Sequence, residues 1–215
     1  MLCPCSVYLE WIFEHNNLWI NMAWVFVMVL VGVFDTLKRI NLSLRYFLLS
    51  FALSGFVTIA IIDTFFLGYV IELDYFFDAR YFIPITGMIL GNTMSHNIVG
   101  LTVYLKELRE KEAFYYFLLT HTNSAKRTQG HFIKEALKAG LNPLIASMSV
   151  IGLISLPGMM TGQILGGSSP VVAIKYQIMI MIAIFVGCTI GLFLGIQAVN
   201  FVILDAMGRI NKKYM

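Results

Sequence analysis

Five long apolar stretches constrain how this chain of 215 residues can fold. The apolar core of a bilayer is about 30 Å thick, so a helix needs roughly 17 to 25 mostly apolar residues to cross it. Charged residues make up only 13% of the chain and hydrophobic residues 59%, whereas a soluble domain carries about 25% charged residues. The sequence therefore predicts an all-α polytopic transmembrane helix bundle that forms a single domain over residues 1–215. Its expected spans are residues 18–34, 44–71, 81–105, 141–165 and 176–204.

The basic residues predict the orientation of these spans. When five spans alternate, residues 35–45, 106–140 and 205–215 lie on one side of the membrane. Only Arg80 and Lys175 lie on the other side, which leaves 13 of the 15 Lys and Arg residues on the first. Basic connections stay in the cytoplasm. We therefore expect the N-terminus outside, the long connection 106–140 and the C-terminus in the cytoplasm, and a multi-pass protein of the inner (plasma) membrane.

Helix breakers interrupt the fourth predicted span. Residues 155–167 read SLPGMMTGQILGG, with Pro157 inside an apolar segment. Such breakers are tolerated in a membrane only where protein or water satisfies the freed backbone groups. The segment is therefore expected to face protein. Gly158 and Gly162 form a GxxxG pair, a spacing that lets two helices approach closely.

A similar motif occurs in the third predicted span. Gly87–Asn92 reads GMILGN and Gly158–Gln163 reads GMMTGQ. The two motifs run in opposite directions at overlapping depth, so they are expected to approach each other at their glycines, Gly87, Gly91, Gly158 and Gly162. This would form a translocation path, in which methionine thioethers offer soft ligands for a metal. The candidate path residues are Met88, Asn92, His96, Met159, Met160 and Gln163.

Each of these polar or soft residues also has a purely structural interpretation. Methionines fill gaps in a glycine packing seam, and His96 can make an ordinary hydrogen bond between helices. Asp63, an ionisable residue inside the second span, is a functional hypothesis by default. Its position near the outer boundary instead favours a side chain that extends to the membrane surface.

Three segments resemble the FetB-type iron-export permease family, to which plant aluminium-tolerance membrane subunits are also similar. They are IPITGMILGN at 83–92, EALKAGLNP at 135–143 and VIGLISLPGMMTGQILGGSSPVVAIKYQIMI at 150–180. The resemblance implies the membrane subunit of an ABC-type exporter of iron or another metal. It also implies a cytoplasmic ATPase subunit that hydrolyses ATP and a second copy of this chain. We expect membrane lipid but no nucleic acid as a further partner, and no cofactor bound by this chain.

The resemblance also gives the connection 106–140 a role, that of docking the ATPase. We expect a short helix within about Phe114–His131 on the cytoplasmic face. The family usually carries a Leu-Gly-Ala step here, whereas this chain has Asn123, which can adopt the left-handed conformation of a glycine turn. The candidate coupling residues are Phe117, His121, Asn123, Lys126 and Arg127.

Two further expectations concern what kind of protein this is. The sequence has no HExxH motif and no phosphate-binding glycine loop, which argues against an enzyme with its own ATPase activity. Members of the family usually have about two further spans before the point where this chain begins. A non-transporting membrane scaffold or a truncated, inactive permease remnant is therefore the alternative.

Overall fold

The protein is all-α, as the sequence predicts. The structure is a computed structural model that describes residues 10–13, 16–66, 68, 77–151, 156–205 and 208–211. An isolated β bridge joins Leu204 and Ile210 after the last helix. The helices are α2 (Leu18–Arg39), α3 (Leu44–Phe65), α4 (Ala79–Glu110), α5 (Glu112–Thr122), α6 (Ala125–Val150), α7 (Gly158–Leu165) and α8 (Pro170–Ile203).

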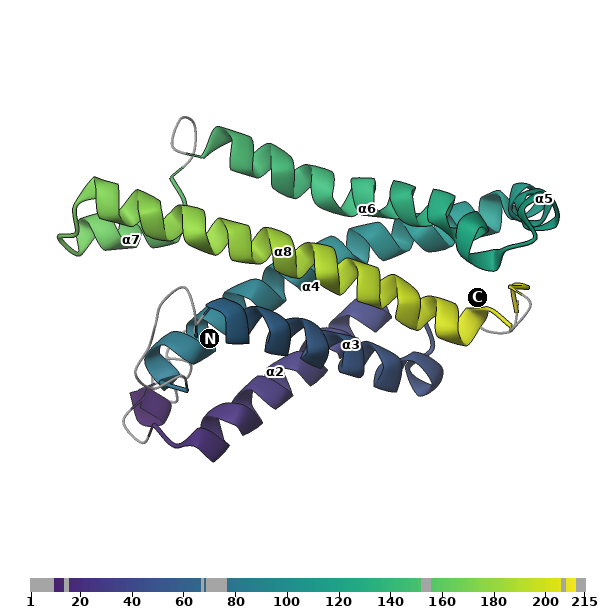
Figure 1. Ribbon diagram of the computed structural model, residues 1–215. Helices are drawn as coiled ribbons and strands as arrows, with labels where there is room; N and C mark the ends of the chain where they lie inside the picture. Colours follow the sequence, from purple (N-terminus) through teal and green to yellow (C-terminus); the bar gives the residue numbers. More distant parts are fainter. Residues whose placement is uncertain are drawn as a thin grey trace.

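The long helices α2, α3, α4, α6 and α8 alternate in direction along the bundle (Figure 1). Helices α2, α4 and α8 begin at the end where α7 lies, and α3 and α6 begin at the opposite end of the bundle. Each of α2, α3 and α8 is long and apolar enough by itself to cross a membrane. Helices α4 and α6 are longer than α2 but carry more polar residues. This arrangement is that of a multi-pass helical bundle.

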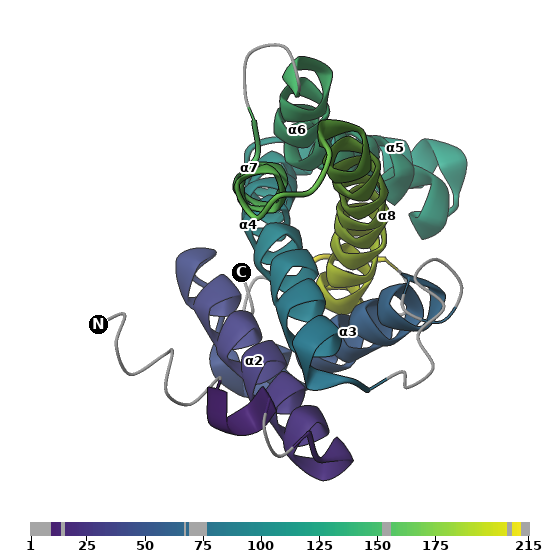
Figure 2. The ribbon, with the colours of Figure 1, turned by 90° about the vertical axis from the view of Figure 1, so that its left-hand side faces the viewer.

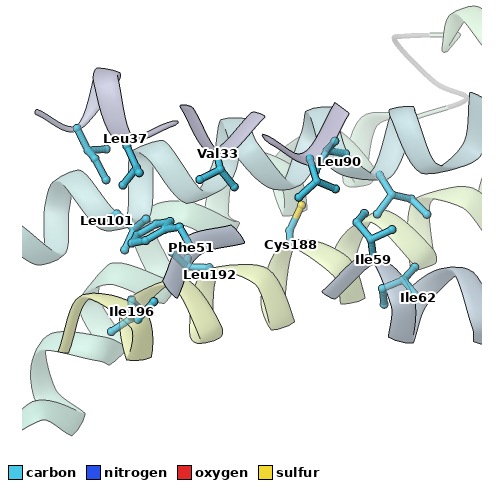
Figure 3. Close-up of a cluster of buried hydrophobic side chains, with 14 of the residues drawn as sticks. Val33, Leu37, Phe51, Ile59, Ile62, Leu90, Leu101, Cys188, Leu192 and Ile196 are labelled. Atoms are coloured by element: carbon cyan, nitrogen blue, oxygen red, sulfur yellow. The ribbon is translucent and has the colours of Figure 1, made fainter. Parts of the chain in front are cut away.

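Helix α4 packs against α2, α6 and α8 (Figure 2). Helix α3 packs mainly against α8 and α2. Apolar side chains from α2, α3, α4 and α8 meet in the core (Figure 3). The labelled members of this cluster are Val33, Leu37, Phe51, Ile59, Ile62, Leu90, Leu101, Cys188, Leu192 and Ile196.

Three helices approach closely where two glycines face Leu192. A Cβ atom on Gly140 of α6 would lie 2.6 Å from Leu192 Cδ2 and 3.1 Å from the carbonyl oxygen of His96 on α4. A Cβ atom on Gly100 of α4 would lie 2.6 Å from Leu192 Cδ1 and 3.1 Å from the carbonyl oxygen of Ala136. Small residues at such crossings let helix backbones pack together in membranes. The α4–α6–α8 contact therefore depends on these two glycines.

Substituting Gly140 is expected to destabilise the bundle. Because Leu192 is fully buried and a carbonyl group faces the new methyl group, Gly140→Ala should cost about 1 to 3 kcal/mol, the usual range for overpacking. Gly130→Ala on the same helix is the matched control, since no described atom lies within 4 Å of its would-be Cβ. Thermal unfolding in detergent should show a lower midpoint for Gly140→Ala and an unchanged or higher midpoint for Gly130→Ala. Equal midpoints would contradict the close crossing.

The structure differs from the expected spans in two places. Residues 141–165 are not one helix, because α6 ends at Val150 and α7 begins at Gly158. The backbone is extended at Ile151 (ψ 134°) and at Pro157 (ψ 146°). The connection 106–140 is not a loop either, since α4 extends to Glu110 and α6 already begins at Ala125. The end of the second expected span, after Phe66, lies largely outside the described residues.

Candidate coupling element and membrane cavity

Helix α5 is fixed to the segment that follows α8. It lies at the end of the bundle where α6 begins and α8 ends (Figure 1). Tyr115 is fully buried, and its hydroxyl donates a hydrogen bond to the Gly208 carbonyl oxygen at 2.7 Å. The Ile210 amide donates to the Tyr116 hydroxyl at 3.3 Å. Burial raises the pKa of Tyr115 further above neutral, which favours the protonated, donating form of its hydroxyl.

A tight turn joins α5 directly to α6. Asn123 has φ 45° and ψ 29°, the left-handed conformation, as the sequence predicts. Its amide donates to the Leu119 carbonyl oxygen at 3.0 Å, which closes the last turn of α5. Ser124 caps α6 by accepting a hydrogen bond from the Arg127 amide. The expected short helix is thus confirmed. It is α5, and a two-residue turn joins it to α6.

Aromatic packing holds α5 against α6. The rings of Tyr115 and Phe132 lie 5.7 Å apart between centroids, and those of Phe114 and Phe132 lie 6.5 Å apart. Phe132 is fully buried. Helix α5 is therefore joined both to α6 and to residues that follow α8.

The predicted coupling residues lie on the exposed side of this element. Phe117 is 54% exposed, and its ring packs on His121 at 4.1 Å between centroids. His121, Asn123, Lys126 and Arg127 are also exposed. The element therefore presents aromatic and basic side chains outward from a rigid base.

A polar network that the sequence analysis missed joins α4, α6 and α8 near this element. The Tyr104 hydroxyl donates to Asn200 Oδ1 at 2.6 Å, and Asn200 Nδ2 donates to Gln129 Oε1 at 3.2 Å. Tyr104 is fully buried and Asn200 is 7% exposed. An amide inside the apolar α8 was the available signal, because a buried amide needs hydrogen-bond partners.

At the opposite end of the bundle, α6, α7 and α8 line a cavity of about 410 Å³. Met160, a predicted path residue, is 4% exposed and forms part of its wall. Met148 of α6, Met181 and Gln177 of α8 also line it. We call this the methionine cavity. The Gln177 side-chain oxygen is buried and has no hydrogen-bond partner among the described residues.

The sequence contained a signal for the α8 wall of the methionine cavity. Its residues recur at the spacing of one helical face: Ile174, Gln177, Ile178, Met181 and Ile182. An amide and a thioether on an otherwise apolar face point to a cavity or a protein contact. Met148 gave no such signal, because the end of α6 was expected inside a continuous span.

The remaining predicted path residues lie in different surroundings. Met159 packs against the apolar core, and the Gln163 side-chain oxygen is buried without a hydrogen-bond partner among the described residues. Met88 on α4 also packs against the core. Asn92 Nδ2 donates to the Met88 carbonyl oxygen of its own helix at 2.8 Å. His96 Nδ1 donates to the Gly140 carbonyl oxygen at 2.7 Å, an ordinary bond between α4 and α6.

The two GMxxG motifs have different neighbours. Helix α7 packs mainly against α8, whereas α4 packs mainly against α2, α6 and α8. A Cβ atom on Gly87 would meet Met28 Cε at 3.0 Å. No described atom lies within 4 Å of the corresponding position on Gly91, Gly158 or Gly162. Of these four glycines only Gly87 is a close packing position, so among the described residues the two motifs do not meet at their glycines as expected.

Asp63 does not extend to the membrane surface, so that expectation is wrong. Asp63 is only 3% exposed, and its Oδ2 accepts a hydrogen bond from the Thr86 hydroxyl at 2.6 Å. The side chain turns toward α4 because Thr86 offers a donor that the lipid does not.

Comparison with known proteins assigns the chain to a family. A family model described as "Uncharacterised protein family (UPF0014)" matches residues 2–202. The chain belongs to the UPF0014 family. This UPF0014 member is similar to "UPF0014 membrane protein YjkA" of Bacillus subtilis, with 30% identity over 80% of this chain and 68% of the relative.

Two further relatives carry names that mention iron or aluminium. "Protein ALUMINUM SENSITIVE 3" of Arabidopsis thaliana is 33% identical over 80% of this chain and 62% of the relative. "Probable iron export permease protein FetB" of Escherichia coli is 31% identical over 80% of this chain and 65% of the relative. The match to FetB confirms the resemblance found in the sequence. The alignments span 62% to 68% of these three relatives, and no solved structure matches this UPF0014 member.

Proposed function

We propose that this UPF0014 member is the permease subunit of an ABC-type exporter that moves iron or another metal. The similarity to a protein named as an iron export permease supports the transport class. The energy comes from ATP hydrolysed by a separate cytoplasmic subunit. The permease acts as a homodimer in the inner membrane, surrounded by lipid, and needs no cofactor of its own.

The single observation that carries this proposal is that α5 has one exposed side and one side fixed to the bundle. A helix that transmits motion from a partner must be rigid, exposed on its docking side and fixed to the membrane helices on the other side. Helix α5 exposes Phe117 and His121. Its opposite side holds Tyr115 fully buried. The left-handed turn at Asn123 passes directly into α6.

Helix α6 provides the link from the coupling end to the methionine cavity. It begins at Ala125, next to the turn, and Met148 near its other end lines the cavity. At a rise of about 1.5 Å per residue these two positions are separated by roughly 35 Å. One helix can therefore carry a displacement of α5 to the methionine cavity, where three thioethers would bind a soft metal ion during transport.

Co-purification tests the partnership with an ATPase. We expect the full chain, co-expressed with an ABC ATPase that carries GxxxxGK[ST], to retain that ATPase through purification. Phe117→Ala with His121→Ala should weaken the complex by about tenfold, as loss of an exposed aromatic anchor does at an interface. Lys38→Ala with Arg45→Ala, which removes basic residues from another connection of the same expected side, is the control and should leave the complex intact. Docking at α5 would be contradicted if the complex survived Phe117→Ala with His121→Ala. Loss of the complex with the Lys38 and Arg45 control variant instead would contradict it as well.

A further inference from the structure

A second cavity of about 410 Å³ lies between α2, α3 and the start of α4. Four phenylalanines line it together with Asp63. We call it the phenylalanine cavity, and its aromatic members are Phe26, Phe56, Phe77 and Phe82. The proposed export mechanism does not use this cavity, which is distinct from the methionine cavity in both its helices and its chemistry.

Asp63 is the acidic group in the wall of this cavity. It is 3% exposed, and the Thr86 hydroxyl bonds to its Oδ2 at 2.6 Å. Its Oδ1 is buried and has no hydrogen-bond partner among the described residues. A carboxylate inside a membrane bundle is costly unless a cation compensates its charge. Asp63 lines the open volume, so a positive group held in the cavity would be close enough to compensate its charge.

The walls of the cavity suit a cation with an apolar body. Aromatic faces carry partial negative charge and attract cations, and aromatic cages recognise quaternary ammonium groups in this way. The rings of Phe26 and Phe56 stack at 5.1 Å, and those of Phe77 and Phe82 meet edge to face at 5.5 Å between centroids. A strongly hydrated metal ion would find one carboxylate and few other oxygen ligands in this lining, which disfavours it.

One wall is held in place by a buried amide. Asn21 is fully buried, and its Nδ2 donates to the Phe77 carbonyl oxygen at 2.9 Å. A second hydrogen bond joins the same two segments: the Ala79 amide donates to Asn16 Oδ1 at 2.9 Å. These bonds connect the start of α4 to the start of α2. The cavity is thus a formed site rather than a gap between loosely placed helices.

The cavity is accessible from the lipid-facing side of the bundle. Met22 and Phe26, two of its lining residues, are 46% and 50% exposed. Both lie on α2, whose length and hydropathy suit a membrane span. An amphiphile dissolved in the bilayer can therefore enter the cavity without crossing an aqueous vestibule.

We propose that the phenylalanine cavity binds an ammonium group carried on an apolar body. Asp63 is its counter-ion, Thr86 orients the carboxylate, and the phenyl rings surround the apolar part of the ligand. The ligand is either the headgroup of a lipid or a free amphiphilic amine, since both present the same chemistry. This inference does not rest on the proposed export function, because binding needs neither an ATPase nor transport.

A matched pair of probes tests the proposal on the full chain in nanodiscs made only of phosphatidylglycerol. The cationic probe is a dansyl-labelled alkyl trimethylammonium, and the neutral probe carries a tert-butyl group in its place. We expect the wild type to bind the cationic probe about tenfold more tightly than the neutral one, as a buried counter-ion and an aromatic cage require. Asp63→Asn keeps the shape and the contact with Thr86 and should remove this preference. Asp35→Asn, at an exposed acid on α2, should retain it.

A second variant keeps the test informative if Asp63→Asn fails to fold. Phe56→Leu preserves the apolar wall but removes one ring. It should therefore lower the affinity for the cationic probe and leave the affinity for the neutral probe unchanged. Equal affinity for both probes in the wild type, or an unchanged preference in Asp63→Asn, would overturn the proposal.

The two sources of the ligand are separated by adding phosphatidylethanolamine to the nanodiscs. If it displaces the cationic probe from the wild type, a lipid headgroup is the natural ligand. If the probe stays bound, the site takes a free amine.

Discussion

Replacing Phe117–Ser124 with a glycine–serine linker of equal length is expected to lower ATP-driven transport by about tenfold or more, because gating elements fail when they no longer move as a unit. The replacement removes the last turn of α5, the left-handed residue Asn123 and the Ser124 cap of α6. It keeps Tyr115 and Phe132, so α6 can still pack in the bundle. A partner's motion would then be absorbed by the linker instead of reaching α6.

The control for this replacement is the short turn between α2 and α3. Asn41→Gly with Ser43→Gly, which keeps the buried Leu42, alters a turn at the same end of the bundle (Figure 1) but leaves α5 intact. Transport and ATPase retention should survive this change. If the linker in place of Phe117–Ser124 left both properties intact, α5 would not be the coupling element.

Replacing the methionines of the methionine cavity with leucine should reduce metal transport by a comparably large factor. Met148→Leu, Met160→Leu and Met181→Leu together preserve volume and apolarity, which a packed core tolerates at a cost usually under about 1.5 kcal/mol. The triple variant removes every thioether from this wall, and soft ligands are what would select a soft metal ion. We expect metal transport to fall by about tenfold or more, in the range that loss of groups supporting a metal site produces. Insertion and ATPase retention should be unaffected.

Two methionines outside the cavity wall provide the comparison. Met28 of α2 and Met179 of α8 pack against the apolar core, so Met28→Leu with Met179→Leu should transport metal normally. Full transport by the triple cavity variant would identify the methionines as packing residues only. Loss of transport in both sets of variants would point to the bundle rather than to the cavity.

The all-α fold and most helix positions could be predicted because membrane thickness and hydropathy act on every span. Helix α2 begins at the expected residue but continues to Arg39, and α8 ends near the expected residue but already begins at Pro170. Helix α6 does not coincide with its expected span, since its first half is polar and its membrane half ends at Val150. Pro157 indicated a disturbed helix, but hydropathy cannot separate an apolar helix from an apolar segment with a break, and residues 141–165 were therefore expected in one span.

The candidate sites were only partly predictable for a different reason. Asn123 and the short helix before it follow from local rules, since an Asn can adopt the left-handed conformation. The methionine cavity combines Met148, Met160 and Met181 from three helices, and their meeting depends on how α6, α7 and α8 pack. Asp63 illustrates the same limit. Its partner Thr86 lies on another helix, so the sequence around Asp63 favoured the wrong surface position.

Transport by the purified complex tests the proposed function most directly. The full chain and its co-expressed ATPase would be reconstituted in proteoliposomes, with ATP and ferrous iron added to the side that carries the ATPase. The account predicts ATP-dependent accumulation of iron in the lumen, and none when the lysine of the GxxxxGK[ST] motif in the ATPase is replaced. Retention of an active ATPase without ATP-dependent movement of iron or of any other metal ion tested would contradict it.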